Sequence, residues 1–167
     1  GMIALPRPDV PPHWAAYATV PDVDQAARQA GELGGKVLVP PTDIPEVGRF
    51  AAVMDPAGAA IYPFTSHGPD QPEIMPPEPH GFFCWRELQT TDVAMSERFH
   101  REIFGWRVTR EDMGDLGPYW MFSRGEKAEA GMMPMPEEVQ RAGVPSHWLC
   151  YVAVDDLAAA VARASEM

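Results

Sequence analysis

A spaced pattern near the start of the chain returns near its end. His13-Trp14-x-x-Tyr17-x-x-Val20-x-Asp22 is matched by His147-Trp148-x-x-Tyr151-x-x-Val154-x-Asp156. Even the preceding residues agree, since Pro11 stands where the second copy has Pro145. Repetition at one spacing indicates duplicated structural units, and it constrains what this chain of 167 residues can fold into.

The first copy opens a unit of order β-α-β-β-β. A strand is predicted at Trp14–Val20, followed by a helix that Asp22 caps and Gly34-Gly35 ends. Further strands are predicted over the ranges Lys36–Val39, Arg49–Met54 and Ala59–Phe64, with a proline-rich loop between the first two and an Asp55-Pro56-Ala57-Gly58 turn before the last.

A second unit repeats this order. A strand at Phe82–Gln89 leads into a helix capped by Asp92. Met95, Phe99 and Ile103 lie at helical spacing and predict its apolar face, while His100 falls on the polar side. The remaining strands are predicted at Trp106–Arg110, Tyr119–Arg124 and Ala128–Met133.

These elements divide the chain into four segments. They are a βαβββ unit at 1–66, a proline-rich linker at 67–80, a βαβββ unit at 81–136, and an incomplete copy of the 12–33 strand and helix at 146–167. The hypothesis that follows is that the chain is the middle of a longer tandem protein, cut at both ends.

Composition excludes several partners. The formal net charge is −11, which repels nucleic-acid phosphates and anionic membranes. No apolar run reaches the ~20 residues of a membrane span. The two cysteines, Cys84 and Cys150, lie far apart outside any CxxC pattern, so we expect buried free thiols and a cytoplasmic protein.

The strand and helix of Gly81–Trp106 carry a family likeness. Phe83-Cys84-Trp85-x-Glu87-Leu88-x-Thr90-x-Asp92 followed by Phe104-Gly105-Trp106 resembles the first module of vicinal oxygen chelate proteins. Val20-x-Asp22 through Gly34-Gly35-Lys36-Val37 and Asp55-Pro56-x-Gly58 resembles the second module. This superfamily includes glyoxalase, bleomycin-resistance and extradiol dioxygenase proteins, and the tandem-domain glyoxalase-like branch is the most similar.

The resemblance implies an α+β fold in which paired βαβββ modules form a curved mixed sheet around a cleft. Here the module of the second type comes first, so the strand and helix at 146–167 lack a partner within the chain. An unpaired strand edge favours association. We therefore expect a homodimer, with exchange of that terminal piece as one way to form it.

Metal-dependent members of the superfamily use histidine and glutamate ligands at set strand positions. The resemblance places those positions at Ala15, Tyr62, Trp85, Leu149 and, on the last strand of the second unit, Gly131-Met132-Met133. None is a usual ligand of a hard or borderline divalent ion. We expect no metal and no other cofactor, and we interpret His13 and His147 as residues that fix a strand entry.

What remains is the cleft that the resemblance implies. Trp85, Glu87 and Gln89 share one face of their strand, because side chains alternate. From the other unit, the cleft-facing residues are predicted to be Tyr17, Thr19, Tyr62 and Phe64. Aromatic walls with few polar groups suit a small organic ligand.

Glu87 is the predicted catalytic residue, since a carboxyl group on an apolar face is expected to have a raised pKa. The alternative is that Glu87 pairs with Arg86, Arg107 or a backbone donor. Four functions stay open. They are metal-free ligand binding, a metal-dependent lyase or dioxygenase with ligands such as Glu87 and His13, a metal-free enzyme with Glu87 as base, and a fragment without an intact site.

Overall fold

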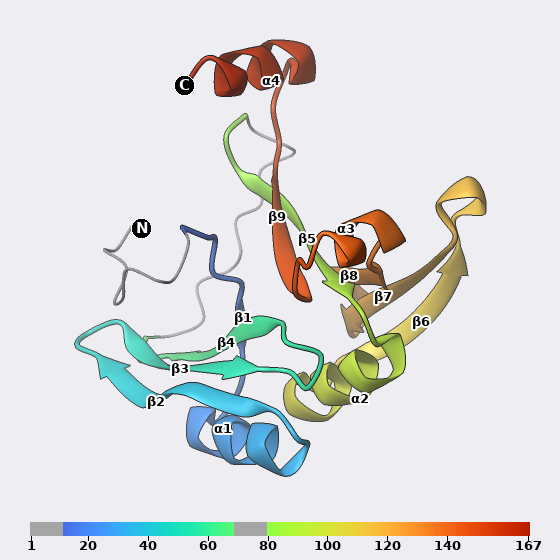
Figure 1. Cartoon of the computed structure of the whole chain (residues 1–167). Coiled ribbons are helices and arrows are strands. Elements are labelled where there is room, and N and C mark those ends of the chain that lie inside the picture. The colour runs from blue at the N-terminus through green and yellow to red at the C-terminus, as the bar shows by residue number, and fades with distance from the viewer. Residues whose placement is uncertain (1–11, 69–79) are drawn as a thin grey trace.

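A computed structural model describes residues 12–68 and 80–167 of the chain (Figure 1). Most of the predicted linker, and residues 1–11 of the predicted first segment, lie outside these ranges. Within them, no helix has the length and apolar character that crossing a membrane requires. The elements, in chain order, are β1 (Tyr17–Thr19), α1 (Val23–Glu32), β2 (Lys36–Ile44), β3 (Gly48–Met54), β4 (Ala60–Ser66), β5 (Phe83–Thr90), α2 (Val93–Phe104), β6 (Arg107–Asp112), a 3-10 helix (Gly114–Leu116), β7 (Pro118–Arg124), β8 (Lys127–Pro134), α3 (Glu137–Arg141), β9 (His147–Val152) and α4 (Leu157–Ser165).

The strands form two mixed sheets. The first has the order β1-β4-β3-β2, with β1 parallel to β4. The second has the order β6-β7-β8-β5-β9, with β5 parallel to β8 and antiparallel to β9. The β-α-β-β-β order occurs in both units, and the predicted α+β fold class is confirmed.

The predicted helix caps Asp22 and Asp92 are confirmed, and Asp156, which holds the same place in the repeat as Asp22, also caps a helix. The carboxylates of Asp22, Asp92 and Asp156 accept hydrogen bonds from backbone N–H groups three residues later, at 2.9 Å in each case. Each aspartate has extended backbone angles, as an N-cap residue requires. The repeated aspartate therefore starts a helix in every copy of the unit.

One apolar core joins the two units. Ala18, Ala51 and Ile61 of the first sheet belong to the same buried cluster as Leu88 and Phe122 of the second. Helix α2 lies against the first unit, and Figure 1 shows it beneath the second sheet and beside the strands of the first. The faces of the two sheets that carry the helices therefore pack around one common hydrophobic core.

A buried polar chain crosses this core. Asp55 Oδ1 accepts a hydrogen bond from Ala59 N at 2.8 Å, which closes the predicted turn. Its Oδ2 accepts one from Ser96 Oγ of α2 at 2.7 Å, and Ser96 Oγ lies 2.8 Å from Thr90 Oγ1. All these side chains are buried, so each needs its partner to offset desolvation.

The predicted loop between the second and third strands is wrong. Strand β2 continues through Pro40 and Pro41 to Ile44, with register shifts against β3 between Val37 and Thr42. Because β2 is the edge strand of its sheet, a proline there can lack an N–H group without breaking a ladder.

The predicted faces of α2 need correction. Met95 is exposed, whereas His100 is fully buried among the rings of Phe104, Trp106 and Trp148. Rings of the second unit itself, among them Phe122 and Trp148, cover the side of α2 that looked polar in the sequence. The prediction of buried thiols also needs correction, because Cys84 is exposed and Cys150 is half-buried, although both are free.

Acidification is expected to destabilise the fold through His100. Burial lowers the pKa of this imidazole, with Asp55 opposing the shift, whereas an unfolded histidine titrates near 6.5. Below about pH 6.5, His100 binds a proton in the unfolded chain but stays neutral in the folded chain. The free energy of unfolding should therefore fall by up to about 1.4 kcal/mol per pH unit, with full stability above that pH.

Urea unfolding between pH 7.5 and 5.5 measures this effect. The variant His100→Phe, which keeps an aromatic ring in the pocket, is expected to flatten the pH dependence. An unchanged slope in His100→Phe would assign the effect to other groups.

Candidate functional site

Glu87 lies at the centre of a hydrogen-bonded cluster on the second sheet. Its Oε1 accepts a hydrogen bond from Tyr151 Oη of β9 at 2.9 Å. Its Oε2 accepts one from Tyr119 Oη of β7 at 3.0 Å, and Trp85 Nε1 donates to the same Tyr119 oxygen at 2.9 Å. Three strands thus hold the carboxylate of Glu87, a residue that is only 8% exposed. We call Trp85, Glu87, Tyr119 and Tyr151 the Glu87 cluster.

The register of β5 explains why these groups meet. Glu87 pairs with Gly131 of β8 on one side and Leu149 of β9 on the other, and Trp85 pairs with Tyr151. A Cβ atom on Gly131 would collide with the Tyr119 phenol, because that ring lies directly over the glycine. The missing side chain at Gly131 is what lets Tyr119 reach Glu87.

Both phenols of the cluster are held in their neutral form. Burial raises the pKa of Tyr151 to about 12, and the hydrogen bond to Glu87 acts in the same direction. Burial also raises the pKa of Tyr119, with Glu87 adding to the shift and Trp85 opposing it. Near neutral pH both hydroxyl groups therefore donate to the carboxylate. Each Glu87 oxygen keeps a second lone pair that can accept a hydrogen bond from a ligand.

The predicted residues of the first unit form a separate group. The Tyr17 ring lies 5.1 Å from that of Tyr62, 6.1 Å from that of Phe64 and 6.5 Å from that of Phe50. These rings, with the exposed Thr19, occupy the face of the first sheet that α1 does not cover. Burial raises the pKa of both Tyr17 and Tyr62.

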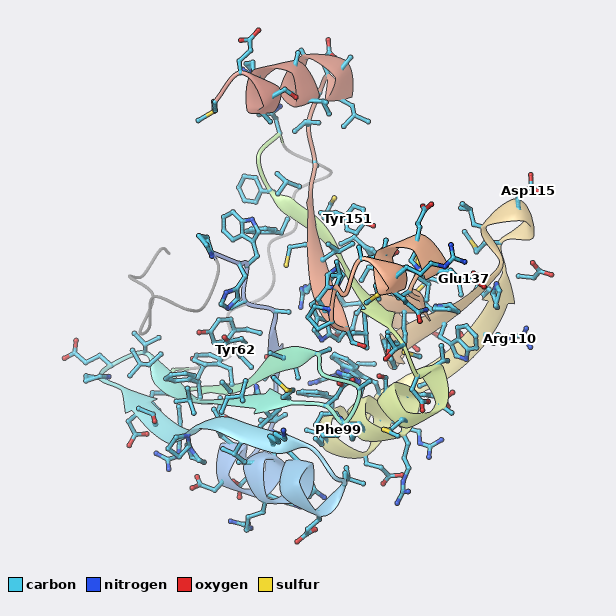
Figure 2. The ribbon with its side chains drawn as sticks, in the orientation of Figure 1. Tyr62, Phe99, Arg110, Asp115, Glu137 and Tyr151 are labelled. Atoms are coloured by element: carbon cyan, nitrogen blue, oxygen red, sulfur yellow. The ribbon has the colours of Figure 1, made fainter. Side chains whose placement is uncertain are left out.

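The structure does not bring these two groups together. Arg86 Nη1 donates to Tyr17 O at 3.3 Å, and Arg124 Nη2 donates to Thr19 O at 2.8 Å. Both arginines alternate with the residues of the Glu87 face, so the edge of β1 meets the opposite side of the second sheet. Figure 2 likewise shows Tyr62 over the first sheet and Tyr151 on β9 of the second.

Gln89 lies one step along the Glu87 face. It pairs with Met133 of β8 and His147 of β9, and it is half-buried. Two hollows of the described surface, of about 430 and 260 Å³, lie instead beside α1 and between α1 and α2. No predicted site residue lines either of these two hollows.

The positions at which the resemblance implies metal ligands do not suit a metal. On the second sheet, Trp85 uses its indole N–H on Tyr119, and Gly131 is covered by the same phenol. On the first sheet, Tyr62 Oη lies 3.4 Å from His13 Nε2. In the described ranges 12–68 and 80–167, no three His, Cys, Asp or Glu side chains come together as a metal site.

Sequence reasoning missed Tyr119 and Tyr151. The repeat pointed to Tyr151, because it occupies the position of Tyr17, a residue already predicted to face a ligand. Gly131 within a strand was the signal for Tyr119, since such a glycine often marks a close approach. The alternatives considered for Glu87 were pairing with Arg86, Arg107 or a backbone donor, and they did not include the two phenols that donate to it in the structure.

Replacing the glycine under Tyr119 tests the cluster. Gly131→Ala is expected to lower the free energy of unfolding by about 1–3 kcal/mol, because the phenol must leave both hydrogen-bond partners. Urea unfolding gives the stability of each variant. The matched control is Gly31→Ala on α1, where an added Cβ meets no atom within 4 Å. This control should raise stability by about 0.5–1 kcal/mol, and a neutral Gly131→Ala would contradict the packing.

The chain is similar in sequence to known proteins over most of its length. It is 30% identical over 158 residues to "Putative glyoxylase CFP32" of Mycobacterium tuberculosis, a match that covers 93% of this chain and 58% of that protein. It is 30% identical over 162 residues to "Anthracycline biosynthesis protein DnrV" of Streptomyces peucetius, covering 95% of this chain and 55% of that protein.

The chain thus spans somewhat more than half the length of these curated relatives. No model of a protein family matches it. The repeated βαβββ units, the mixed sheets and the similarity to these proteins agree with one another. The chain is similar to these proteins over most of its own length, and its fold agrees with the resemblance to the glyoxalase-like branch of the vicinal oxygen chelate superfamily.

Proposed function

We propose that this chain binds a small organic molecule on the Glu87 cluster without a metal ion. The supporting observation is the Glu87 carboxylate, whose two oxygens each accept a hydrogen bond from a neutral tyrosine. These bonds fix the orientation of the carboxylate before a ligand arrives. A fixed acceptor costs less entropy on binding than a mobile one.

The groups around the carboxylate suit an aromatic ligand. Trp85 and Tyr119 are half-buried, and Tyr151 is 43% exposed, so each presents part of a ring beside Glu87. Aromatic rings stack on flat organic molecules, while the carboxylate selects those that carry a hydroxyl or N–H donor. The ligand class is therefore a flat aromatic compound with a hydrogen-bond donor.

The relatives favour a test with two kinds of compound. One is named for anthracycline biosynthesis, and anthracyclines contain a hydroxylated anthraquinone. Another is named a glyoxylase, for which the hemithioacetal of methylglyoxal and a thiol is a suitable probe. We favour the hydroxyanthraquinone, because the Glu87 cluster combines ring surfaces with one acceptor, and no three His, Cys, Asp or Glu side chains of the described residues come together as a metal site.

Metal-dependent catalysis through Glu87 and His13 is the weaker candidate. His13 contacts Tyr62 of the first sheet, and Glu87 lies on the face of the second sheet that points away from the first. The second lone pairs of Glu87 leave base catalysis without a metal open, as an activity on the same bound ligand.

Glu87→Gln is expected to weaken the binding of 1,4-dihydroxyanthraquinone at least tenfold. The amide keeps the shape of the side chain but removes a charged acceptor, a change worth about 1.5–3 kcal/mol for a hydrogen bond to a charged group. Quenching of tryptophan fluorescence during titration measures the dissociation constant. Unsubstituted anthraquinone, which lacks the donor, should bind equally weakly to both proteins.

The control variant is Tyr62→Phe, which removes a phenol from the first sheet and should leave the affinity unchanged. Prior dialysis against a chelator should also have no effect, and elemental analysis should find no bound divalent metal. If Tyr62→Phe lost binding while Glu87→Gln kept full binding, the ligand would bind on the first sheet and not on the Glu87 cluster.

A further inference from the structure

Three buried nitrogen atoms in the core of the second unit have no hydrogen-bond partner. They are His100 Nε2, Trp106 Nε1 and Trp148 Nε1, and they are the only such side-chain nitrogen or oxygen atoms within residues 12–68 and 80–167. The three residues are at most 8% exposed. A buried polar atom without a partner costs the fold free energy, because the same atom binds water in the unfolded chain. Three such atoms in one place therefore need an explanation.

The three side chains belong to a single cluster of rings. The ring centroids of His100 and Trp148 lie 5.3 Å apart, and those of His100 and Trp106 lie 6.4 Å apart. His100 comes from α2, Trp148 from β9, and Trp106 from the junction between α2 and β6. A hydrogen bond spans about 2.9 Å, so one small molecule can bridge polar atoms that lie about 5–6 Å apart. The separations of these rings are of that size.

The hydrogen-bonding role of each nitrogen follows from its chemistry. His100 Nδ1 lies 2.8 Å from Ser96 O, and since a carbonyl oxygen only accepts, Nδ1 carries the hydrogen. Burial lowers the pKa of His100, so the ring is neutral near pH 7 and its Nε2 keeps a lone pair. An indole nitrogen only donates. The cluster thus presents one acceptor and two donors.

This combination selects a neutral molecule. An anion would meet the lone pair of His100 Nε2, and a cation would meet the two indole N–H groups. Either charge would also be costly among the neighbouring rings of Phe104 and Phe122. Water is the smallest neutral molecule that both donates and accepts, and an internal water typically makes about three hydrogen bonds to buried polar groups.

We infer that the second unit binds one internal water molecule among His100, Trp106 and Trp148. The water donates one hydrogen to His100 Nε2 and accepts from both indole N–H groups. It extends the buried polar chain of the core, in which Asp55 accepts from Ser96 Oγ and the Ser96 carbonyl accepts from His100 Nδ1. One end of this chain lies in the first unit, and the water connects the other end to β9.

NMR spectroscopy of the ¹⁵N-labelled chain tests the inference. The Hε1 protons of Trp106 and Trp148 are expected to show cross-relaxation with a water molecule that tumbles with the protein. Both N–H groups should exchange with D2O at least 100-fold more slowly than that of Trp14, which is 64% exposed. Slow exchange separates this cross-relaxation from direct proton exchange with the solvent. The imidazole spectrum of His100 should show a hydrogen on Nδ1 and none on Nε2.

The same substitution at two histidines gives a matched pair. His100→Phe keeps a ring in the cluster but removes the acceptor, so it should abolish the water contacts of both indoles. His147→Phe makes the same change next to Trp148 but on the opposite face of β9, and it should leave both contacts intact. A retained Trp85 signal shows that a variant is folded. If His100→Phe does not fold, the spectra of the unaltered chain decide the question.

Four results would overturn the inference. The first is a missing water contact at one or both indoles, since a shared water must contact both. The second is a scalar coupling across a direct hydrogen bond from an indole nitrogen to His100 Nε2. The third is a hydrogen on His100 Nε2, which could then accept nothing. The fourth is an equal effect of His100→Phe and His147→Phe on the two contacts.

Discussion

The hydrogen bond between Asp55 and Ser96 is the contact around which the two units assemble. It connects the turn before β4 to the first turn of α2, and both side chains are buried in the core. Neither group could be buried alone without a cost of roughly 1–3 kcal/mol or more, so docking of the units and satisfaction of the pair occur together. Gly35 permits the same approach, since a Cβ atom there would overlap the Phe99 ring.

This mode of docking determines which faces remain free. Because the helix-covered sides of both sheets meet in one core, the uncovered sides point in different directions. Tyr17, Tyr62 and Phe64 remain on one of them, and Glu87 remains on the other. The resemblance implied a cleft shared by two modules, but the contacts between the units of this chain use the opposite face of the second sheet.

Local features of the fold could be predicted from the sequence. The repeated aspartates, the alternation along β5 and the Asp55 turn each depend on a few neighbouring residues, and all three have the expected form. The predictions that were wrong concern features that depend on residues far away in the sequence. Burial of His100 depends on rings as distant in the sequence as Phe122 and Trp148, and the passage of β2 through two prolines follows from its place at a sheet edge.

The site was predicted in part for the same reason. Glu87 and Trp85 lie on one strand, so alternation alone placed them on a common face. Their partners come from other strands, and the register between strands cannot be deduced from the sequence alone. Only two indirect signals pointed to them, the glycine at Gly131 and the repeat that relates Tyr151 to Tyr17. Reading a repeat for side chains as well as for strands would have recovered Tyr151.

Tyr151 also connects the candidate site to the open edge of the second sheet. Its hydroxyl group donates to Glu87, while its backbone belongs to β9, which is an edge strand of the second sheet among the residues that the structure describes. A strand held on one side only is freer to move than a strand held on both. Any segment that pairs with β9 therefore restricts the Tyr151 phenol and, through it, one oxygen of Glu87. In the first unit the equivalent Tyr17 already has such a neighbour, because it pairs with Tyr62 of β4. The geometry of the carboxylate thus depends on a residue of an edge strand, although Glu87 itself is one strand further in.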